Sequence, residues 1–259
     1  MPAPLTPVRR AATALLVSLL LVAGACSGER PSLADDAERT TTTAERTTTT
    51  EPAPVAAEVA TAKELTIDVF ASEDATEADR EIVSGVDTSV DTIPIVFLVK
   101  EPADGERIEV YLPVRPNGSS GWVDAADVDV STVPYRIEVG ISEKRIRVFD
   151  GEEVIVDEPV GVGREDRPTP GGIYYLKELL QPPTPGGPYG SFAYGLSGFS
   201  NVLQSFAGGP GVIGIHGTND PSSVGGDVSS GCIRLQNDVI ERMVDEIGLP
   251  LGTPVEILA

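Results

Sequence analysis

Hydrophobic and polar residues alternate along several short stretches of the chain, a pattern typical of half-buried β-strands. The alternation runs through residues 65–70, 108–112, 135–139 and 145–149. Residues 93–99 are more continuously apolar and predict a more buried strand, and apolar runs at 154–156 and 255–258 predict two more. Because the turn pair Asp150-Gly151 separates two of these runs, we expect a β-hairpin there.

The helical spacing of apolar residues is clearest in residues 237–247. Asn237 or Asp238 can cap this helix and Gly248 can end it, and the apolar face consists of Val239, Ile240, Met243, Val244 and Ile247. Proline and glycine dominate residues 167–172 and 182–188, which predicts a long surface loop able to line a groove. The pattern as a whole predicts a mainly β protein with one or two short helices, divided into a small β module (residues 64–133) and a second β-rich domain (residues 134–259).

The first 63 residues differ in character from the rest. Arg9 and Arg10 precede an apolar run that ends in small residues, so residues 1–26 are expected to be a secretory signal. Residues 27–63 are rich in Thr, Glu and Pro and have too little apolar surface to fold, which predicts a disordered stalk.

Cys26 follows Ala23-Gly24-Ala25, an arrangement that resembles the bacterial lipoprotein signal, although that signal prefers a larger aliphatic residue at the position of Ala23. The resemblance implies that Cys26 is lipidated and holds the chain at the outer face of the cell membrane or in the cell wall. Ordinary signal cleavage and a disulfide between Cys26 and Cys232 are the open alternatives.

The formal net charge of −21 excludes a general affinity for nucleic acid, because nucleic-acid binding requires a basic surface. The acidic field is compatible with a cationic or amine-bearing substrate, and equally with a role in solubility alone.

His216 is the only histidine, and Cys232 is the only cysteine beyond the signal segment. An imidazole close to a thiol is the usual means of making a nucleophilic thiolate. A structural role is the alternative, but Cys232 follows Ser229-Ser230-Gly231 and precedes polar residues, unlike a core cysteine. Backbone amides near Gly231 and Cys232, together with the start of the helix, could stabilise an oxyanion and the thiolate. These residues predict acyl transfer through a thioester. No metal is expected, because one His and one free Cys do not form a zinc site.

The segments His216-Gly217-Thr218-Asn219 and Ser229-Ser230-Gly231-Cys232-Ile233-Arg234-Leu235 resemble the active-site signature of the L,D-transpeptidases of the YkuD type. Residues 169–176 are similar to the family's segment after the first hairpin, and the resemblance extends from about residue 135 to residue 259. It implies that Cys232 is the nucleophile, His216 the base, the Gly217 carbonyl the group that orients the imidazole, and Gly231 an oxyanion donor. Residues 110–123 resemble the SH3-like modules that precede bacterial cell-wall enzymes.

The chain departs from the family signature at Ser230, where the family usually has a histidine directly before the Gly-Cys pair. A serine hydroxyl can still donate or accept a hydrogen bond, so rate, pH optimum or substrate range is where a difference is expected. Arg234 matches the arginine of the signature and has two open roles, holding a substrate carboxylate or supporting the loop.

The resemblance implies an enzyme without a cofactor that crosslinks peptidoglycan stem peptides, and we expect it to be tied to the membrane by the N-terminal lipid. Two alternatives remain open at this stage. Water could resolve the thioester, which would make the protein a carboxypeptidase or hydrolase of stem peptides, or the chain could be a non-catalytic wall-binding lipoprotein.

Overall fold

A computed structural model of the chain describes residues 56–85, 92–184, 186–206 and 208–259, which fall within one compact unit, Glu51–Ala259. The predicted signal segment, Cys26 and the stalk up to residue 55 lie outside the described residues. Within the described residues, the helices are too short and too polar to span a membrane.

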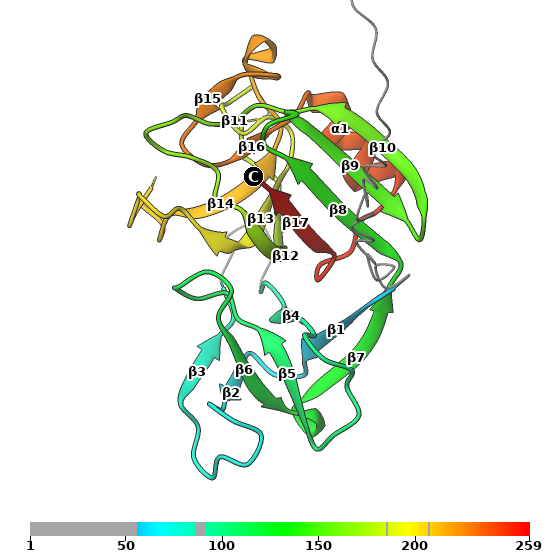
Figure 1. Cartoon of the computed structure of the whole chain (residues 1–259), viewed down its shortest axis with the longest axis vertical. Coiled ribbons are helices and arrows are strands. Elements are labelled where there is room, and N and C mark those ends of the chain that lie inside the picture. Colours follow the sequence, from blue (N-terminus) through cyan, green and yellow to red (C-terminus); the bar gives the residue numbers. More distant parts are fainter. Residues whose placement is uncertain (1–55, 86–91, 185, 207) are drawn as a thin grey trace, which may run out of the picture. The chain divides into compact units, whose positions relative to one another are not determined.

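The N-terminal part, residues 56–133, is built from short antiparallel pairs (Figure 1). Its three-stranded sheet has the order β4-β1-β7, and β2-β3 and β5-β6 form two further pairs. The isolated bridges Phe70–Trp122 and Val99–Val110 connect these pairs around a shared apolar core. The strands are β1 (Ala57–Ala62), β2 (Thr66–Val69), β3 (Arg80–Val83), β4 (Val96–Leu98), β5 (Arg107–Tyr111), β6 (Ser120–Asp124) and β7 (Val128–Val133). The likeness of this part to SH3-like modules stays a prediction.

The predicted disordered stalk, residues 27–63, is wrong at its C-terminal end, because residues 57–62 form strand β1. β1 hydrogen-bonds to β4 on one side and to β7 on the other, and it buries Val59 and Ala60. Its sequence, AEVATA, has few strong strand formers. The residues of β1 have a weak intrinsic preference for a strand, and hydrogen bonding to β4 and β7 stabilises the strand instead. Strand preference depends on such neighbours.

The C-terminal part, residues 134–259, is organised around an eight-stranded sheet with the order β10-β9-β8-β17-β12-β13-β14-β16. Most neighbours are antiparallel, whereas β17 runs parallel to β8 and β16 runs parallel to β14. The mainly β fold class is confirmed. The strands are β8 (Tyr135–Gly140), β9 (Arg145–Asp150), β10 (Glu153–Pro159), β11 (Val162–Gly163), β12 (Gly172–Leu180), β13 (Ala193–Phe199), β14 (Val212–His216), β15 (Asp227–Ser229), β16 (Ile233–Arg234) and β17 (Pro254–Leu258).

The predicted hairpin is confirmed as β9 and β10, which pair antiparallel on either side of Asp150-Gly151. Gly151 adopts a φ of 58°, a conformation that glycine accepts at little cost. The long loop predicted between residues 167 and 188 is wrong in its middle, because β12 occupies Gly172–Leu180 and pairs with β13 and β17. Tyr174, Tyr175 and Leu176 are buried in that strand, and this burial outweighs the glycine and proline around it.

The predicted helix over residues 237–247 begins as α1 (Asn237–Glu241) and continues as a π-helical turn, Arg242–Glu246. Ile240 and Met243 are fully buried in the core of the sheet. Arg242 Nη2 donates to the Ile155 carbonyl of β10 at 2.9 Å, which ties the helix to that edge (Figure 1). The predicted cap is wrong: Gln236 is the N-cap residue and makes no side-chain cap bond. Gly248 follows the helix with a φ of 69°, as predicted for a helix end.

Strand β13 was not predicted, although six of its seven residues are buried. Its sequence, AYGLSGF, places two glycines and a serine among the apolar residues. The ring of Tyr174 lies where a side chain on Gly198 would have to be, at 2.3 Å from a Cβ built there. Glycine is therefore required by close packing in a strand whose composition is typical of a loop.

Truncating a buried core side chain is expected to lower stability, and Ile146 in β9 is fully buried. Ile146→Ala should cost about 2–5 kcal/mol of unfolding free energy, because it removes buried methyl groups and leaves a cavity. Urea denaturation followed by circular dichroism measures the change. Ile173→Ala is the matched control, because Ile173 is 46% exposed in β12. Equal unfolding midpoints for the two variants would contradict this assignment of the core.

Candidate active site

The parallel pairing of β14 with β16 places three of the predicted site residues on one face of the sheet. Ile215 pairs with Ile233 and His216 pairs with Arg234, and the Leu235 amide donates to the His216 carbonyl at 2.8 Å. Cys232 directly precedes β16, two positions from Arg234. Since side chains alternate between faces along a strand, Cys232 and Arg234 share the face on which His216 lies.

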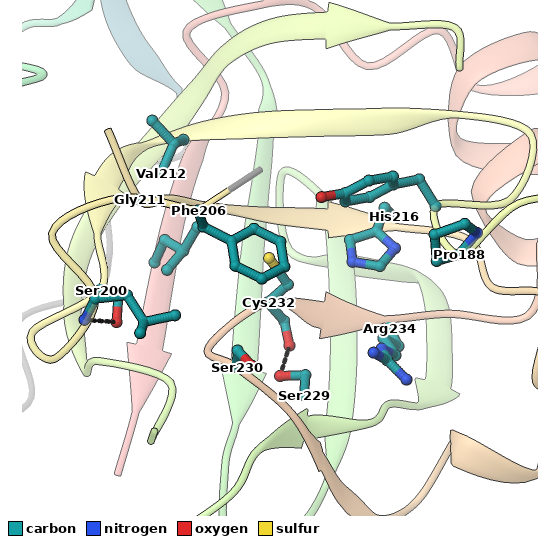
Figure 2. A pocket seen from close by; sticks show the side chains of 13 residues that line it. Pro188, Ser200, Phe206, Gly211, Val212, His216, Ser229, Ser230, Cys232 and Arg234 are labelled. Carbon is teal, nitrogen blue, oxygen red and sulfur yellow. Dashed lines mark hydrogen bonds between the residues drawn. The ribbon is translucent and has the colours of Figure 1, made fainter. Parts of the chain in front are cut away.

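These three side chains line a cavity of about 100 Å³ (Figure 2). The structure therefore brings together residues that are 16 positions apart in the sequence. Cys232 has no disulfide partner among the described residues. Cys26 lies outside them, so the disulfide alternative stays untested.

The imidazole of His216 is buried and has a defined orientation. Its Nδ1 lies 2.6 Å from the Gly217 carbonyl oxygen. A carbonyl only accepts hydrogen bonds, so Nδ1 carries the ring proton and Nε2 keeps a lone pair. The ring of Tyr189 packs edge-on against the imidazole, with centroids 4.9 Å apart. The contact between His216 and Gly217 therefore leaves Nε2 as the basic atom.

The turn that follows His216 is held by groups from two other segments. The Thr218 amide donates to Asn237 Oδ1 at 2.9 Å, so Asn237 fixes this turn instead of capping α1. Gly190, with a φ of 66°, approaches so closely that a Cβ there would lie 2.6 Å from Gly217 Cα. Both contacts limit the movement of the Gly217 carbonyl that orients the imidazole.

Burial sets the protonation of both central residues. The pKa of His216 is lowered to about 4, mainly by burial; the hydrogen bond to Gly217 opposes this shift and the positive charge of Arg234 adds to it. Burial raises the pKa of the Cys232 thiol above its ordinary value, and a backbone hydrogen bond at Gly214 and the charge of Arg234 only partly offset this. Near neutral pH the resting pair is therefore a neutral thiol and a neutral imidazole, not the thiolate expected from the sequence.

Helix α1 stabilises a thiolate at Cys232 less than the sequence predicts. It has five residues, begins at Asn237, and is separated from Cys232 by β16. The groups that favour the thiolate are instead the Gly214 backbone and Arg234.

The turn before Cys232 corrects the predicted role of Gly231. The Gly231 amide donates to Ser229 Oγ at 3.0 Å, and that hydroxyl donates to the Cys232 carbonyl at 2.6 Å. The Gly231 N–H is thus used to close the turn and is not available to an oxyanion. Within the part of the chain that the structure describes, the Cys232 amide has no acceptor, which makes it the better candidate donor.

Ser230 and Arg234 both line the cavity. Ser230 Oγ accepts a hydrogen bond of 3.4 Å from Arg167 Nη1, so an arginine approaches the position where the family usually has histidine. Nε of Arg234 is buried and has no hydrogen-bond partner among the described residues. An unpaired buried N–H costs free energy, which a bound acceptor would recover.

The walls of the cavity come from two loops (Figure 2). Pro188 belongs to the loop predicted to line a groove, and this part of the prediction is confirmed; Tyr189, which also lines the cavity, directly follows that loop. Ser200, Leu203, Phe206 and Gly211, between β13 and β14, were not predicted. These four residues belong to no motif. Only their position directly before β14, the strand that ends in His216, could have indicated that they lie near the site.

Among the described residues, no group of three or more His, Cys, Asp or Glu side chains is arranged to hold a metal ion.

Comparison with known proteins finds relatives among the L,D-transpeptidases. Residues 134–257 match the model of the YkuD family, the L,D-transpeptidase catalytic domain. The YkuD protein of Bacillus licheniformis, named as an L,D-transpeptidase, is 38% identical over 156 residues, covering 58% of this chain and 85% of that protein. Its namesake in Bacillus subtilis is 39% identical over 130 residues, covering 50% of this chain and 69% of that protein.

Among solved structures, an L,D-transpeptidase from Mycobacterium smegmatis aligns with a TM-score of 0.39 and 17% identity, covering 74% of this chain and 99% of that chain. Both Bacillus relatives are more than 30% identical to this chain and are covered over more than two thirds of their length, and the chain therefore belongs to the L,D-transpeptidase family with a YkuD-type catalytic domain.

Proposed function

We propose that the protein crosslinks peptidoglycan stem peptides through a thioester on Cys232. The observation that carries the proposal is the β14–β16 pairing, which puts Cys232, His216 and Arg234 on one cavity. The contact between His216 Nδ1 and the Gly217 carbonyl supports it, because that contact leaves Nε2 to act as a base. Family membership supplies the substrate class.

The first half-reaction is acylation of Cys232. As the sulfur attacks the carbonyl carbon at the L-centre of diaminopimelate in a donor stem, His216 Nε2 takes the thiol proton. The Cys232 amide donates to the oxyanion that forms. When the tetrahedral intermediate collapses, the C–N bond breaks and His216 returns the proton to the nitrogen of the terminal D-alanine. The products are the thioester and free D-alanine.

The second half-reaction transfers the acyl group. The side-chain amine of an acceptor stem attacks the thioester carbon and His216 takes a proton from it. The C–S bond then breaks, and the sulfur recovers that proton as a thiol. Because both resting groups are neutral, the proposal places the loss of the thiol proton in the acylation step.

Arg234 is proposed to bind a substrate carboxylate. Its guanidinium lines the cavity and its Nε lacks a partner in the described structure, whereas an arginine whose role was to support the loop would have its donors occupied. Export by residues 1–26, lipidation of Cys26 and action at the outer face of the membrane belong to the same proposal. They are supported by the sequence of the N-terminal segment.

Replacing the nucleophile is expected to abolish the reaction. With tetrapeptide-stem muropeptides, Cys232→Ala should lower D-alanine release and crosslinked product by at least about 10³-fold, because no thioester can form. Mass spectrometry of the products measures both. Intact mass after incubation with a carbapenem should show one adduct on the native protein and none on the variant.

The product ratio separates transpeptidation from hydrolysis. Crosslinked product that rises with added amine acceptor supports the proposal. A free tripeptide stem, formed without crosslinked product even when the acceptor is present, indicates that water resolves the thioester. Abundant product from Cys232→Ala would refute the assignment of the nucleophile.

The neutral resting pair predicts the pH dependence of thiol alkylation. With Cys26→Ala as background, the rate of Cys232 alkylation by iodoacetamide should rise about tenfold per pH unit between about pH 6 and about pH 8, because only the growing thiolate fraction reacts. The raised pKa of Cys232 sets this window, since the thiolate stays a minor species throughout it.

The same protein unfolded in urea is the control, because its thiol has an ordinary pKa and its rate should level off at lower pH. A pH-independent plateau of the native rate across this range would contradict the prediction. It would show that a thiolate–imidazolium pair exists at rest.

A further inference from the structure

We propose that the turn between β5 and β6 of the N-terminal part positions the wall of the active-site cavity, with Arg115 and Asn117 as positioning residues. The wall segment is defined as residues 199–206 and 208–211, from which Ser200, Leu203, Phe206 and Gly211 line the cavity. The proposal rests on the proposed function for its substrate. It extends that function by giving the N-terminal part a role in shaping the site.

Arg115 binds the wall segment at both of its ends. Nη1 donates to the Ser200 carbonyl at 2.7 Å, and Nη2 donates to the carbonyls of Leu203 at 2.9 Å and Pro210 at 3.1 Å. The guanidinium also stacks over the ring of Phe199, 4.8 Å from its centroid. A planar guanidinium with several fixed donors can hold three carbonyls at once, which an ammonium group cannot do in the same geometry.

Asn117 fixes the start of the wall segment. Its Nδ2 donates to the Phe199 carbonyl at 2.8 Å, and its Oδ1 accepts from the Phe199 amide at 2.9 Å. This pair of bonds imitates a strand partner for the last residue of β13. Arg115 and Asn117 together satisfy four backbone carbonyls and one amide of the wall segment.

Among the described residues, the hydrogen bonds within the wall segment lie at its tip and at its base, where Ser200 Oγ accepts from the amides of Val202 at 3.3 Å and Leu203 at 3.1 Å. The Ser200 amide donates to the Gly211 carbonyl at 2.9 Å, and Phe206 and Gly209 exchange two backbone bonds at the tip. Gly211, with a φ of 75°, packs so closely that a Cβ there would lie 2.5 Å from the Leu203 carbonyl and 3.2 Å from Arg115 Nη2. The contacts with the turn therefore set where Leu203 and Phe206 stand beside Cys232.

The expected consequence is a change in substrate binding with an intact nucleophile. Arg115→Ala and Asn117→Ala should each raise KM for the tetrapeptide donor about tenfold and change kcat much less. A displaced wall segment weakens binding of the substrate and of its transition state by the same amount, which leaves kcat nearly unchanged. Arg115→Lys should fail to restore KM.

Arg107→Ala is the matched control. Arg107 makes the same kind of contacts within the N-terminal part, donating to the carbonyls of Ser72, Glu73 and Ala75 and lying 3.4 Å from the Phe70 ring centroid. Its removal disturbs that part but none of the wall contacts, so KM should not change. If the substitutions acted only by unfolding part of the protein, both arginine variants would contain less active enzyme. Both would then show a lower apparent kcat and an unchanged KM.

Hydrogen exchange in the full chain tests the contacts without any substrate. In Arg115→Ala the amides of residues 199–206, 208, 209 and 211 should exchange faster, while those of β14 and β16 should not. Unchanged exchange in the wall segment overturns the proposal, as does faster exchange with an unchanged KM. If the native protein releases no D-alanine, the proposed function fails, and hydrogen exchange still decides whether the turn positions the wall.

Discussion

The site depends on one short parallel strand pair. β14 and β16 are joined by only two paired positions, yet this register decides which side chains share a face with His216. A slip of one residue would send Cys232 and Arg234 to the opposite face, because side chains alternate along a strand. The buried residues Ile215 and Ile233 oppose such a slip, since it would move Ile233 out of the core. The hydrophobic core thus fixes the relative placement of Cys232 and His216.

Much of the fold could be predicted from local patterns. The alternating stretches became β2, β5, β8 and β9, and the Asp150-Gly151 turn became a hairpin, because each of these signals is contained within a few residues. Strands β1 and β13 escaped prediction because their Ala, Gly and Ser residues are selected by neighbours distant in the sequence. Asn237 shows the same limit: its position suggested a helix cap, and its side chain instead binds the Thr218 amide.

The site residues that belong to a sequence motif could be predicted from the sequence. Cys232 and His216 stood out as unique residues at a recognisable spacing, and the structure brings them to one cavity. Three features required three-dimensional information. The Gly231 amide is used by Ser229, the Tyr189 ring packs against the imidazole, and Arg115 reaches the wall from 85 residues away in the sequence. Protonation also escaped prediction, because burial is a property of the whole fold.

The raised pKa of the Cys232 thiol has a further consequence for the durability of the protein. Oxidation by peroxide and exchange with small disulfides both proceed through the thiolate, so their rates follow the thiolate fraction. A thiol that is mostly protonated near neutral pH reacts slowly with such agents. The burial of Cys232 would thus protect it in an oxidising environment, where a permanently ionised cysteine is soon oxidised to sulfinic acid.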